Sequence, residues 1–263
     1  MQLEVCGVSV DVTVSGKGER ACLLLHGWGC SAQMMGSVAS LLDRHMRVAA
    51  IDFPGHGQNG RAPEPPKPWG VPEYMEMTVQ IIRKLNLAPC DIVAHSFGAR
   101  VAILLASTYP ELVGRMVLTG AAGIRKPPSA QMSGRQKLYK GLRGAMNLAE
   151  KTHLFGSLPE KGREALVQKF GSEDYRVLTP SMRQTFNKVI NLDLTDRLER
   201  IKASTLLYWG AQDDATPLWM GRIMEEKIPD AGLVVEENAG HFAFLEQNAR
   251  FLRIVSSFLL EGR

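Results

Sequence analysis

Short apolar runs rich in β-branched residues alternate with segments of helical periodicity along most of the chain. Strands that are covered on both faces of a sheet are apolar throughout, and their alternation with helices is typical of parallel sheets. The pattern therefore predicts an α/β fold, with a mostly parallel central sheet and helices on both of its faces. Besides an opening hairpin over Leu3–Val14 with a turn at Gly16 and Gly18, the predicted strands are Ala21–Leu25, Val48–Ile51, Asp91–Ala94, Val113–Leu118, Thr205–Trp209 and Leu233–Glu236.

Capping and breaking residues divide the helices from these strands. Ser31 is expected to cap the helix that follows the first buried strand, because serine is favoured at that position. Thr216 and Pro217 suit the cap and the first position of another helix. Proline excludes the segment Ala62–Pro72 from a helix or an inner strand, so it should be a surface connection. Helical periodicity is clearest around Met75–Leu85 and over Phe97–Tyr109 and Asn248–Leu260.

The strand pattern stops between Gly123 and Asn191, where three helical patterns follow one another. A compact domain does not otherwise interrupt its strands for so long. We therefore predict a helical insertion, or cap, at 123–191 and an α/β core formed by 1–122 and 192–263. The first pattern is amphipathic, and the others lie near Lys161–Phe170 and Ser181–Val189. Its apolar side consists of Leu138, Leu142 and Met146, and its basic side of Lys137, Lys140 and Arg143.

Length and composition suit one α/β unit with an insertion. The chain has 263 residues, of which 45% are hydrophobic and 22% charged, which excludes disordered, collagenous and disulfide-scaffold proteins. There is no apolar run of the about 20 residues that span a bilayer and no signal-peptide pattern, so we expect a cytoplasmic protein without a transmembrane segment. Four cysteines without C-x-x-C spacing predict reduced thiols and no zinc site. They are Cys6, Cys22, Cys30 and Cys90.

Charge is distributed unevenly along the chain. The residues from Arg125 to Ile190 include 13 Lys or Arg and 5 Asp or Glu, although the net charge of the whole chain is only +4. The insertion is therefore strongly cationic. Its charges either form ordinary solvated helix faces or bind an acidic carrier protein, an anionic lipid surface or a carboxylate substrate. We expect no nucleic-acid partner.

A serine stands where an apolar strand runs into a helix, in the sequence Ile92–Gly98. Small residues two positions before and after Ser96, Ala94 and Gly98, permit the tight turn of a nucleophile elbow. Such a turn exposes the serine hydroxyl at the carboxyl end of the sheet in a strained conformation. The plainer alternative is that Ser96 only caps the helix.

A serine hydroxyl needs a base in contact with it and a third group that orients the base. Asp213 follows one predicted strand and His241 follows the next, so the chain order Ser96, Asp213, His241 is the one this architecture requires. Asp214 is the alternative to Asp213. These three side chains are the predicted catalytic residues.

Attack on a carbonyl forms an oxyanion, which needs two rigid backbone donors. We predict that the N–H of Phe97, directly after the nucleophile, and the N–H of Trp28 provide them. The remaining candidates have structural interpretations. His26 and His56 are expected to brace loops, and Asp52 to anchor the turn Gly55–Gly57. His95 is expected to flank the elbow with its side chain turned away from Ser96.

Together these motifs resemble the α/β-hydrolase superfamily. The resemblance implies a serine hydrolase of carboxylic esters that forms an acyl-enzyme without cofactor or metal, and an insertion that covers the active site and selects the substrate. It also places the catalytic acid three residues after Gly210, which favours Asp213. The matching pieces, in the expected order, are His26–Gly29, Asp52–Gly57, Ala94–Gly98, Gly210–Asp213 and Gly240–His241.

Serine at position 96 argues against haloalkane dehalogenases and epoxide hydrolases, because those members of the superfamily need a carboxylate nucleophile. Other reactions stay open, since the same triad serves thioesterases, lactonases, carbon–carbon bond hydrolases and lyases. A non-catalytic ligand receptor is a further alternative. The Trp28 loop and the basic insertion also resemble pimeloyl-carrier-protein methyl ester esterases. The prediction is thus a serine esterase acting on a small-molecule ester.

Overall fold

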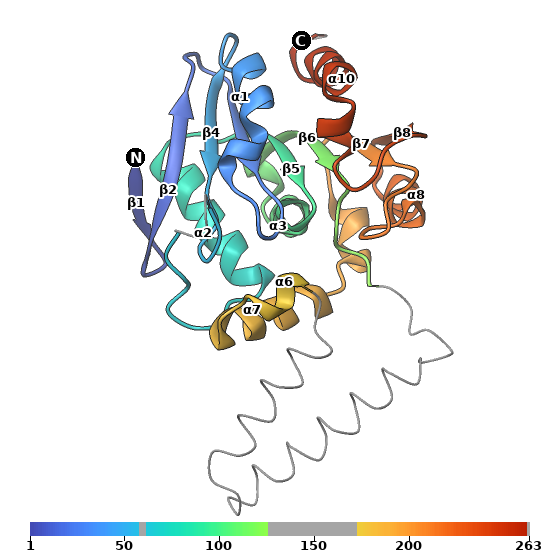
Figure 1. Cartoon of the computed structure of the whole chain (residues 1–263). Coiled ribbons are helices and arrows are strands. Elements are labelled where there is room, and N and C mark those ends of the chain that lie inside the picture. Colours follow the sequence, from blue (N-terminus) through green and yellow to red (C-terminus); the bar gives the residue numbers. More distant parts are fainter. Residues whose placement is uncertain (58–61, 126–172, 262–263) are drawn as a thin grey trace, which may run out of the picture. The chain divides into compact units, whose positions relative to one another are not determined.

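A computed structural model describes residues 1–57, 62–125 and 173–261 of the chain. Eight strands form one sheet in the order β1-β2-β4-β3-β5-β6-β7-β8 (Figure 1). All pairs from β4 to β8 across the sheet are parallel, and only β2 runs antiparallel to its neighbours. This confirms the predicted α/β fold. The strands are β1 (Gln2–Val5), β2 (Val8–Ser15), β3 (Ala21–Leu25), β4 (Arg47–Ile51), β5 (Cys90–His95), β6 (Val113–Thr119), β7 (Thr205–Gly210) and β8 (Ala231–Glu236).

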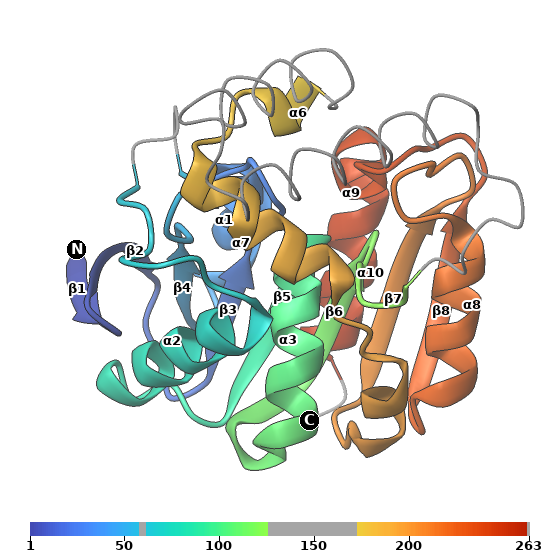
Figure 2. The same cartoon turned by 90° about the horizontal axis from the view of Figure 1, so that it is seen from below.

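Helices cover both faces of this sheet (Figure 2). Leu23 and Leu25 of β3 pack into the core shared with α2, α3 and α8, while Cys22 and Leu24 pack against α1, α9 and α10. Successive strand residues point to opposite faces, so β3 is buried throughout. The helices are α1 (Gly36–Leu42), α2 (Val71–Lys84), α3 (Phe97–Thr108), α6 (Glu173–Arg176), α7 (Pro180–Asn191), α8 (Leu218–Lys227), α9 (Ala243–Glu246) and α10 (Asn248–Leu260), with short 3-10 helices at Ala32–Met35, Pro110–Leu112 and Thr195–Arg200.

The chain divides into two compact units. One consists of Met1–Arg125 with Gln184–Arg263, and the other of Lys126–Arg183. The predicted helical patterns around Leu138 and over Lys161–Phe170 lie outside the described residues. The third pattern corresponds to α7. The predicted limits of the insertion, 123–191, stay a prediction.

The opening hairpin forms, but its predicted turn at Gly16 and Gly18 is wrong. β1 and β2 are joined by Cys6 and Gly7, whose φ angles of 52° and 75° are the kind that tight two-residue hairpin turns require. β2 then continues and pairs with β4. Gly16 has a different role, because a Cβ there would lie 2.2 Å from the carbonyl oxygen of Met46. It lets the end of β2 pass close to the chain that enters β4.

Candidate active site

Ser96 connects β5 to α3 in a backbone conformation that L-residues rarely adopt. Its φ of 50° and ψ of −107° lie outside the favoured regions. The surrounding backbone holds it there, because its N–H donates to the Thr119 carbonyl over 3.1 Å and its carbonyl accepts from the N–H of Ala122 over 3.2 Å. A Cβ on Gly98 would lie 2.5 Å from the carbonyl oxygen of Leu25. The requirement for a small residue at this position is therefore steric.

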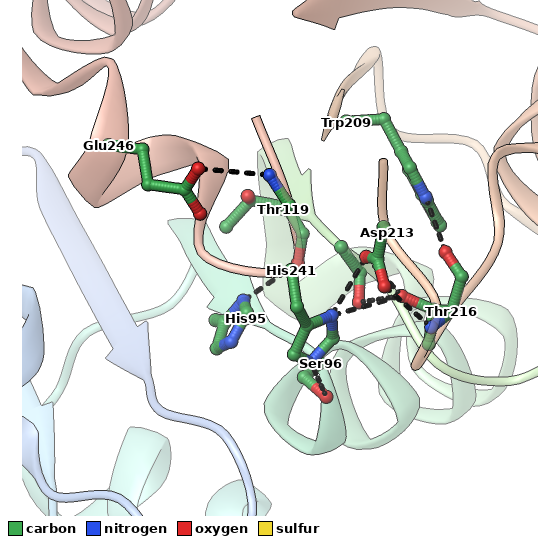
Figure 3. A network of polar contacts seen from close by, with 10 residues as sticks. His95, Ser96, Thr119, Trp209, Asp213, Thr216, His241 and Glu246 are labelled. Carbon is green, nitrogen blue, oxygen red and sulfur yellow. Dashed lines mark hydrogen bonds and ion pairs between the residues drawn. The ribbon is translucent and has the colours of Figure 1, made fainter. Parts of the chain in front are cut away.

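The side chains of Ser96, His241 and Asp213 come together from three loops that follow β5, β8 and β7 (Figure 3). His241 Nε2 lies 3.0 Å from Ser96 Oγ, and His241 Nδ1 lies 2.8 Å from Asp213 Oδ2. Asp213 is buried, whereas the neighbouring Asp214 is exposed. The structure thus brings together the three side chains that the sequence predicts, with Asp213 rather than Asp214 at the histidine.

Close approach of two loop backbones makes this arrangement possible. A Cβ on Gly210, at the end of β7, would lie 2.2 Å from the carbonyl oxygen of Ala239 and 2.3 Å from that of Gly240. Any side chain at position 210 would therefore push the loop that carries Asp213 away from the loop that carries His241. The glycine keeps the carboxylate and the imidazole within hydrogen-bonding distance.

The hydrogen bonds around Asp213 favour its ionised form. Burial by itself raises the pKa of the Asp213 carboxyl, but hydrogen bonds from His241 and from the N–H and hydroxyl of Thr216 outweigh it and hold the pKa below its ordinary value. An ionised carboxylate can only accept, so the proton between the two side chains belongs on His241 Nδ1. Nε2 is then free to accept the hydroxyl proton of Ser96.

Thr216 belongs to this site, although the sequence predicts that it caps a helix. The prediction that it caps the next helix is wrong, because α8 begins at Leu218 and Pro217 precedes it. The N–H of Thr216 instead donates to Asp213 Oδ1 over 2.8 Å, and its hydroxyl lies 2.8 Å from Asp213 Oδ2. The spacing of three residues between an aspartate and a threonine, typical of a side chain that caps a turn, is the sequence signal that could have revealed this contact.

His95 packs against the ring of His241, with 4.8 Å between ring centroids. Its Nδ1 lies 3.1 Å from the Thr119 carbonyl oxygen, to which it can donate. Burial, followed by the proximity of His241, lowers the pKa of His95 to about 3. His95 is therefore neutral near pH 7 and supports the imidazole beside it without adding a second positive charge.

The loop that carries Trp28 is fastened by the loop Asp52–Gly57. The N–H of Phe53 donates to His26 Nε2 over 3.0 Å, and the N–H of Gly29 donates to His56 Nδ1 over 3.2 Å. Burial lowers the pKa of His26 to about 4 and that of His56 to about 3, so both rings stay neutral and can accept these hydrogen bonds. The two histidines brace loops, as the sequence predicts.

Asp52 and Ser31 differ from their predicted roles. The carboxylate of Asp52 accepts a hydrogen bond of 2.6 Å from the N–H of Ala32, so it holds the start of the 3-10 helix Ala32–Met35 and not the turn Gly55–Gly57. Ser31 precedes that helix, but its side chain makes no capping hydrogen bond. The long-range carboxylate satisfies the first N–H of this helix, and the serine side chain satisfies none of the others.

The two predicted oxyanion donors have no acceptor among the described residues. Among the residues that the structure describes, neither the N–H of Trp28 nor that of Phe97 donates a hydrogen bond. Phe97 is the first residue of α3, where the N–H has no helical acceptor. The ring of Trp28 contacts those of Phe97 and Phe186, at centroid distances of 5.3 and 5.1 Å. Both N–H groups can therefore donate to a further hydrogen-bond partner, and both belong to residues whose aromatic rings pack against each other.

The described ranges have neither a side-chain cluster typical of a metal site nor a helix typical of a membrane span. In residues 1–57, 62–125 and 173–261, no three His, Cys, Asp or Glu side chains are grouped so that they could hold a metal ion. Over the same ranges, no helix has the length and apolar character needed to cross a membrane. Cys6, Cys22, Cys30 and Cys90 form no disulfide bond in the part of the chain that the structure describes.

Comparison with known proteins identifies the family. The model of the alpha/beta hydrolase family matches residues 22–254, so the chain belongs to this family. It is 29% identical to a 2-hydroxymuconate semialdehyde hydrolase of Pseudomonas putida over 270 residues, covering 99% of this chain and 94% of the relative. It is 25% identical to a pimeloyl-[acyl-carrier protein] methyl ester esterase of Neisseria meningitidis over 250 residues, covering 90% of this chain and 92% of the relative.

The solved structures agree with this assignment. A meta-cleavage product hydrolase from Pseudomonas fluorescens IP01 superposes with a TM-score of 0.73 at 25% sequence identity, covering 100% of this chain and 98% of the other. The resemblance to α/β hydrolases inferred from the motifs is confirmed. The relatives named here are hydrolases that differ in the bond they break.

Replacing Ser96 by glycine should give a more stable protein than replacing it by alanine. Glycine adopts a positive φ without steric cost, whereas alanine keeps the strain. We expect the free energy of unfolding of Ser96→Gly to exceed that of Ser96→Ala by about 1 kcal/mol in urea titrations. Ser256 lies inside α10, where alanine is favoured over glycine. The free energy of unfolding of Ser256→Ala should therefore exceed that of Ser256→Gly by about 1 kcal/mol. The same order at both positions would contradict the strained turn.

Proposed function

We propose that this chain is a serine hydrolase that cleaves carboxylic esters. Ser96 is the nucleophile, His241 the general base and Asp213 the group that orients the base. The observation that supports this most directly is the continuous contact from Ser96 Oγ to His241 Nε2, at 3.0 Å, and from His241 Nδ1 to Asp213 Oδ2, at 2.8 Å. Both distances are within the range at which a base removes a proton from a nucleophile.

In this mechanism His241 takes the hydroxyl proton while Ser96 Oγ attacks the ester carbonyl. The N–H groups of Trp28 and Phe97 bind the oxyanion, and loss of one such donor typically lowers kcat by about 10² to 10³. His241 then gives its proton to the departing alcohol, leaving an acyl group on Ser96. A water molecule, deprotonated by His241, attacks this acyl group and releases the acid. The reaction as written needs no cofactor.

Hydrolysis of a carbon–carbon bond is the second candidate. It is favoured by the similarity to 2-hydroxymuconate semialdehyde hydrolase, which extends over 99% of this chain. The same serine, histidine and oxyanion donors would act on an aldehyde or ketone carbonyl, with a carbanion as the leaving group that takes up a proton. The two candidates therefore differ in the leaving group that the site must protonate.

A comparison of substrates separates these candidates. We expect kcat/KM for p-nitrophenyl esters of short and medium acyl chains to exceed kcat/KM for 2-hydroxymuconate semialdehyde, because an alkoxide or phenolate leaves more readily than a carbanion. The esters are followed by release of p-nitrophenol and the semialdehyde by loss of its absorbance. Faster turnover of the semialdehyde would replace the first proposal by the second.

Replacing Ser96 by alanine should lower p-nitrophenyl ester hydrolysis about 10³-fold or more, because the acyl-enzyme can no longer form. A burst of p-nitrophenol in the unmodified protein, absent in Ser96→Ala, would show the acyl intermediate. Ser107→Ala, at the other end of the same helix α3, serves as the control and should keep full activity. Unchanged hydrolysis in Ser96→Ala would exclude Ser96 as the nucleophile.

The basic segment from Arg125 to Ile190 is proposed to bind an acidic carrier protein or an anionic substrate, on the strength of its 13 Lys or Arg against 5 Asp or Glu. Similarity to a pimeloyl-[acyl-carrier protein] methyl ester esterase is consistent with such a partner. The residues most suited to test this lie outside the described part of the chain. They are Lys137, Lys140 and Arg143.

Reversing these three charges to glutamate should raise KM for an acyl methyl ester borne on an acidic carrier protein. Activity on small neutral esters should stay the same, because their binding does not depend on the cationic field. Steady-state kinetics at two salt concentrations measure both, since the effect should weaken as salt screens the charges. Equal effects on the carrier-bound and the neutral ester would contradict the proposed partner, and the three charges would then be ordinary solvated ones.

A further inference from the structure

The loop between β7 and α8 places Thr216 beside both Asp213 and His241. Thr216 is 6% exposed. Its carbonyl accepts a hydrogen bond of 2.7 Å from the indole N–H of Trp209, which is itself buried, and its N–H donates to Asp213 Oδ1 over 2.8 Å. The main chain of Thr216 is therefore fixed on both sides, and its side chain has little freedom to move.

The hydroxyl of Thr216 lies at the centre of three polar groups (Figure 3). Its oxygen is 2.8 Å from Asp213 Oδ2, 3.0 Å from the carbonyl oxygen of Gly120 and 3.3 Å from His241 Nδ1. The hydroxyl has one hydrogen, while the carboxylate and the carbonyl can only accept. When His241 Nδ1 carries a proton, the hydroxyl hydrogen therefore points either to Asp213 or to Gly120, and Nδ1 could accept it only in the other tautomer.

Both orientations stabilise the same protonation state. If the hydroxyl donates to Asp213, it stabilises the ionised carboxylate directly. If it donates to Gly120, its lone pairs face His241 Nδ1–H and share that proton with Asp213. Each arrangement has the proton on Nδ1, and this leaves Nε2 as the acceptor for the Ser96 hydroxyl.

The lack of a side chain at Gly120 is needed for these contacts. Its φ is +49°, and a Cβ there would lie 3.0 Å from the His241 carbonyl oxygen and 3.2 Å from His241 Nδ1. The absence of a side chain lets the Gly120 backbone lie against the imidazole and present its carbonyl to Thr216. That carbonyl competes with Nδ1 for the hydroxyl hydrogen and so disfavours the tautomer in which Nδ1 is an acceptor.

We infer that Thr216 is a positioning residue, whose hydroxyl and N–H together fix the orientation of the Asp213 carboxylate and keep the His241 proton on Nδ1. One carboxylate oxygen is held by the N–H, and the other is held by the hydroxyl and the imidazole. The inference rests on the proposed function, since it assigns Thr216 to the triad of that mechanism. Thr216 acts through Asp213 and His241 and does not touch the substrate.

Thr216→Val tests this inference, because valine has nearly the same shape, keeps the N–H and lacks only the hydroxyl. We expect kcat for p-nitrophenyl ester hydrolysis to fall about 10- to 100-fold with KM unchanged, the effect of losing one hydrogen bond to a charged group. Thr216→Ser, which restores the hydroxyl, should recover most of kcat. In a Ser96→Ala background, Thr216→Val should cause no further loss, because the two residues act as a unit.

Thr195→Val is the matched control. Thr195 also contacts an aspartate through its N–H, over 3.0 Å, and its hydroxyl, over 2.6 Å, although both reach the same oxygen, Oδ1 of Asp193, and it begins the 3-10 helix Thr195–Arg200 outside the triad. Its substitution removes one threonine–aspartate hydrogen bond and should leave kcat unchanged. An equal fall of kcat in both variants would assign the effect of Thr216 to general loosening of the protein.

A proton NMR spectrum provides a readout that does not need turnover. The downfield Nδ1–H signal of His241 should be present in the unmodified protein and in Thr216→Ser, and shifted or lost by exchange with water in Thr216→Val. Thr216→Ala replaces the valine variant if the latter does not fold. A wild-type kcat and an unchanged signal in a folded hydroxyl-free variant would overturn the inference. If instead Ser96→Ala keeps full activity, the proposed function fails, while the NMR signal still decides the role of Thr216.

Discussion

The geometry of the site depends on backbone segments that approach one another more closely than any side chain would allow. A Cβ on Gly98, Gly210 or Gly120 would lie 2.5, 2.2 or 3.0 Å from a neighbouring carbonyl oxygen. Each of these glycines stands at or just beyond the carboxyl edge of the sheet, where two segments of backbone pass close to one another. Their positions let the serine, the carboxylate and the imidazole meet although they are far apart in the sequence. The strained backbone of Ser96 belongs to the same constraint, because the turn around it is held by bonds to Thr119 and Ala122.

Burial divides the histidines of the site into two kinds. His26, His56 and His95 are buried and have pKa values lowered to about 4, 3 and 3, so they remain neutral and serve as acceptors or packing partners. His241 has the ionised Asp213 at its Nδ1 and a partly exposed ring. Of these four histidines, His241 is the one whose ring contacts a carboxylate within hydrogen-bonding distance. The neutral rings around it provide a rigid surface without competing for the proton.

The sequence predicts those parts of the molecule that depend on local pattern. The apolar strands, the helix after Ser96 and the order of serine, aspartate and histidine all follow from periodicity and motif spacing, and the fold that they imply is confirmed. Most of the errors concern contacts across the fold. Asp52 satisfies the N–H of Ala32 from 20 positions away, and the hydroxyl of Thr216 reaches the carbonyl of Gly120, 96 positions away, where a local helix cap was expected. The contact between Thr216 and Asp213 is local, and the spacing of the two residues could have indicated it, but no local pattern indicates the partner at Gly120.

The two hydrolases to which this chain is similar break different bonds, at 29% and 25% identity over nearly the whole chain. Both reactions develop charge on a carbonyl oxygen and on an imidazole, so one set of residues can serve either of them. Oxyanion donors and a held imidazole lower the barrier for any attack on a carbonyl and carry little information about the leaving group. The leaving group must be recognised by side chains outside this set. Discrimination between ester and carbon–carbon bond cleavage is therefore expected to depend on the residues that surround the triad, and the triad itself can be the same in both.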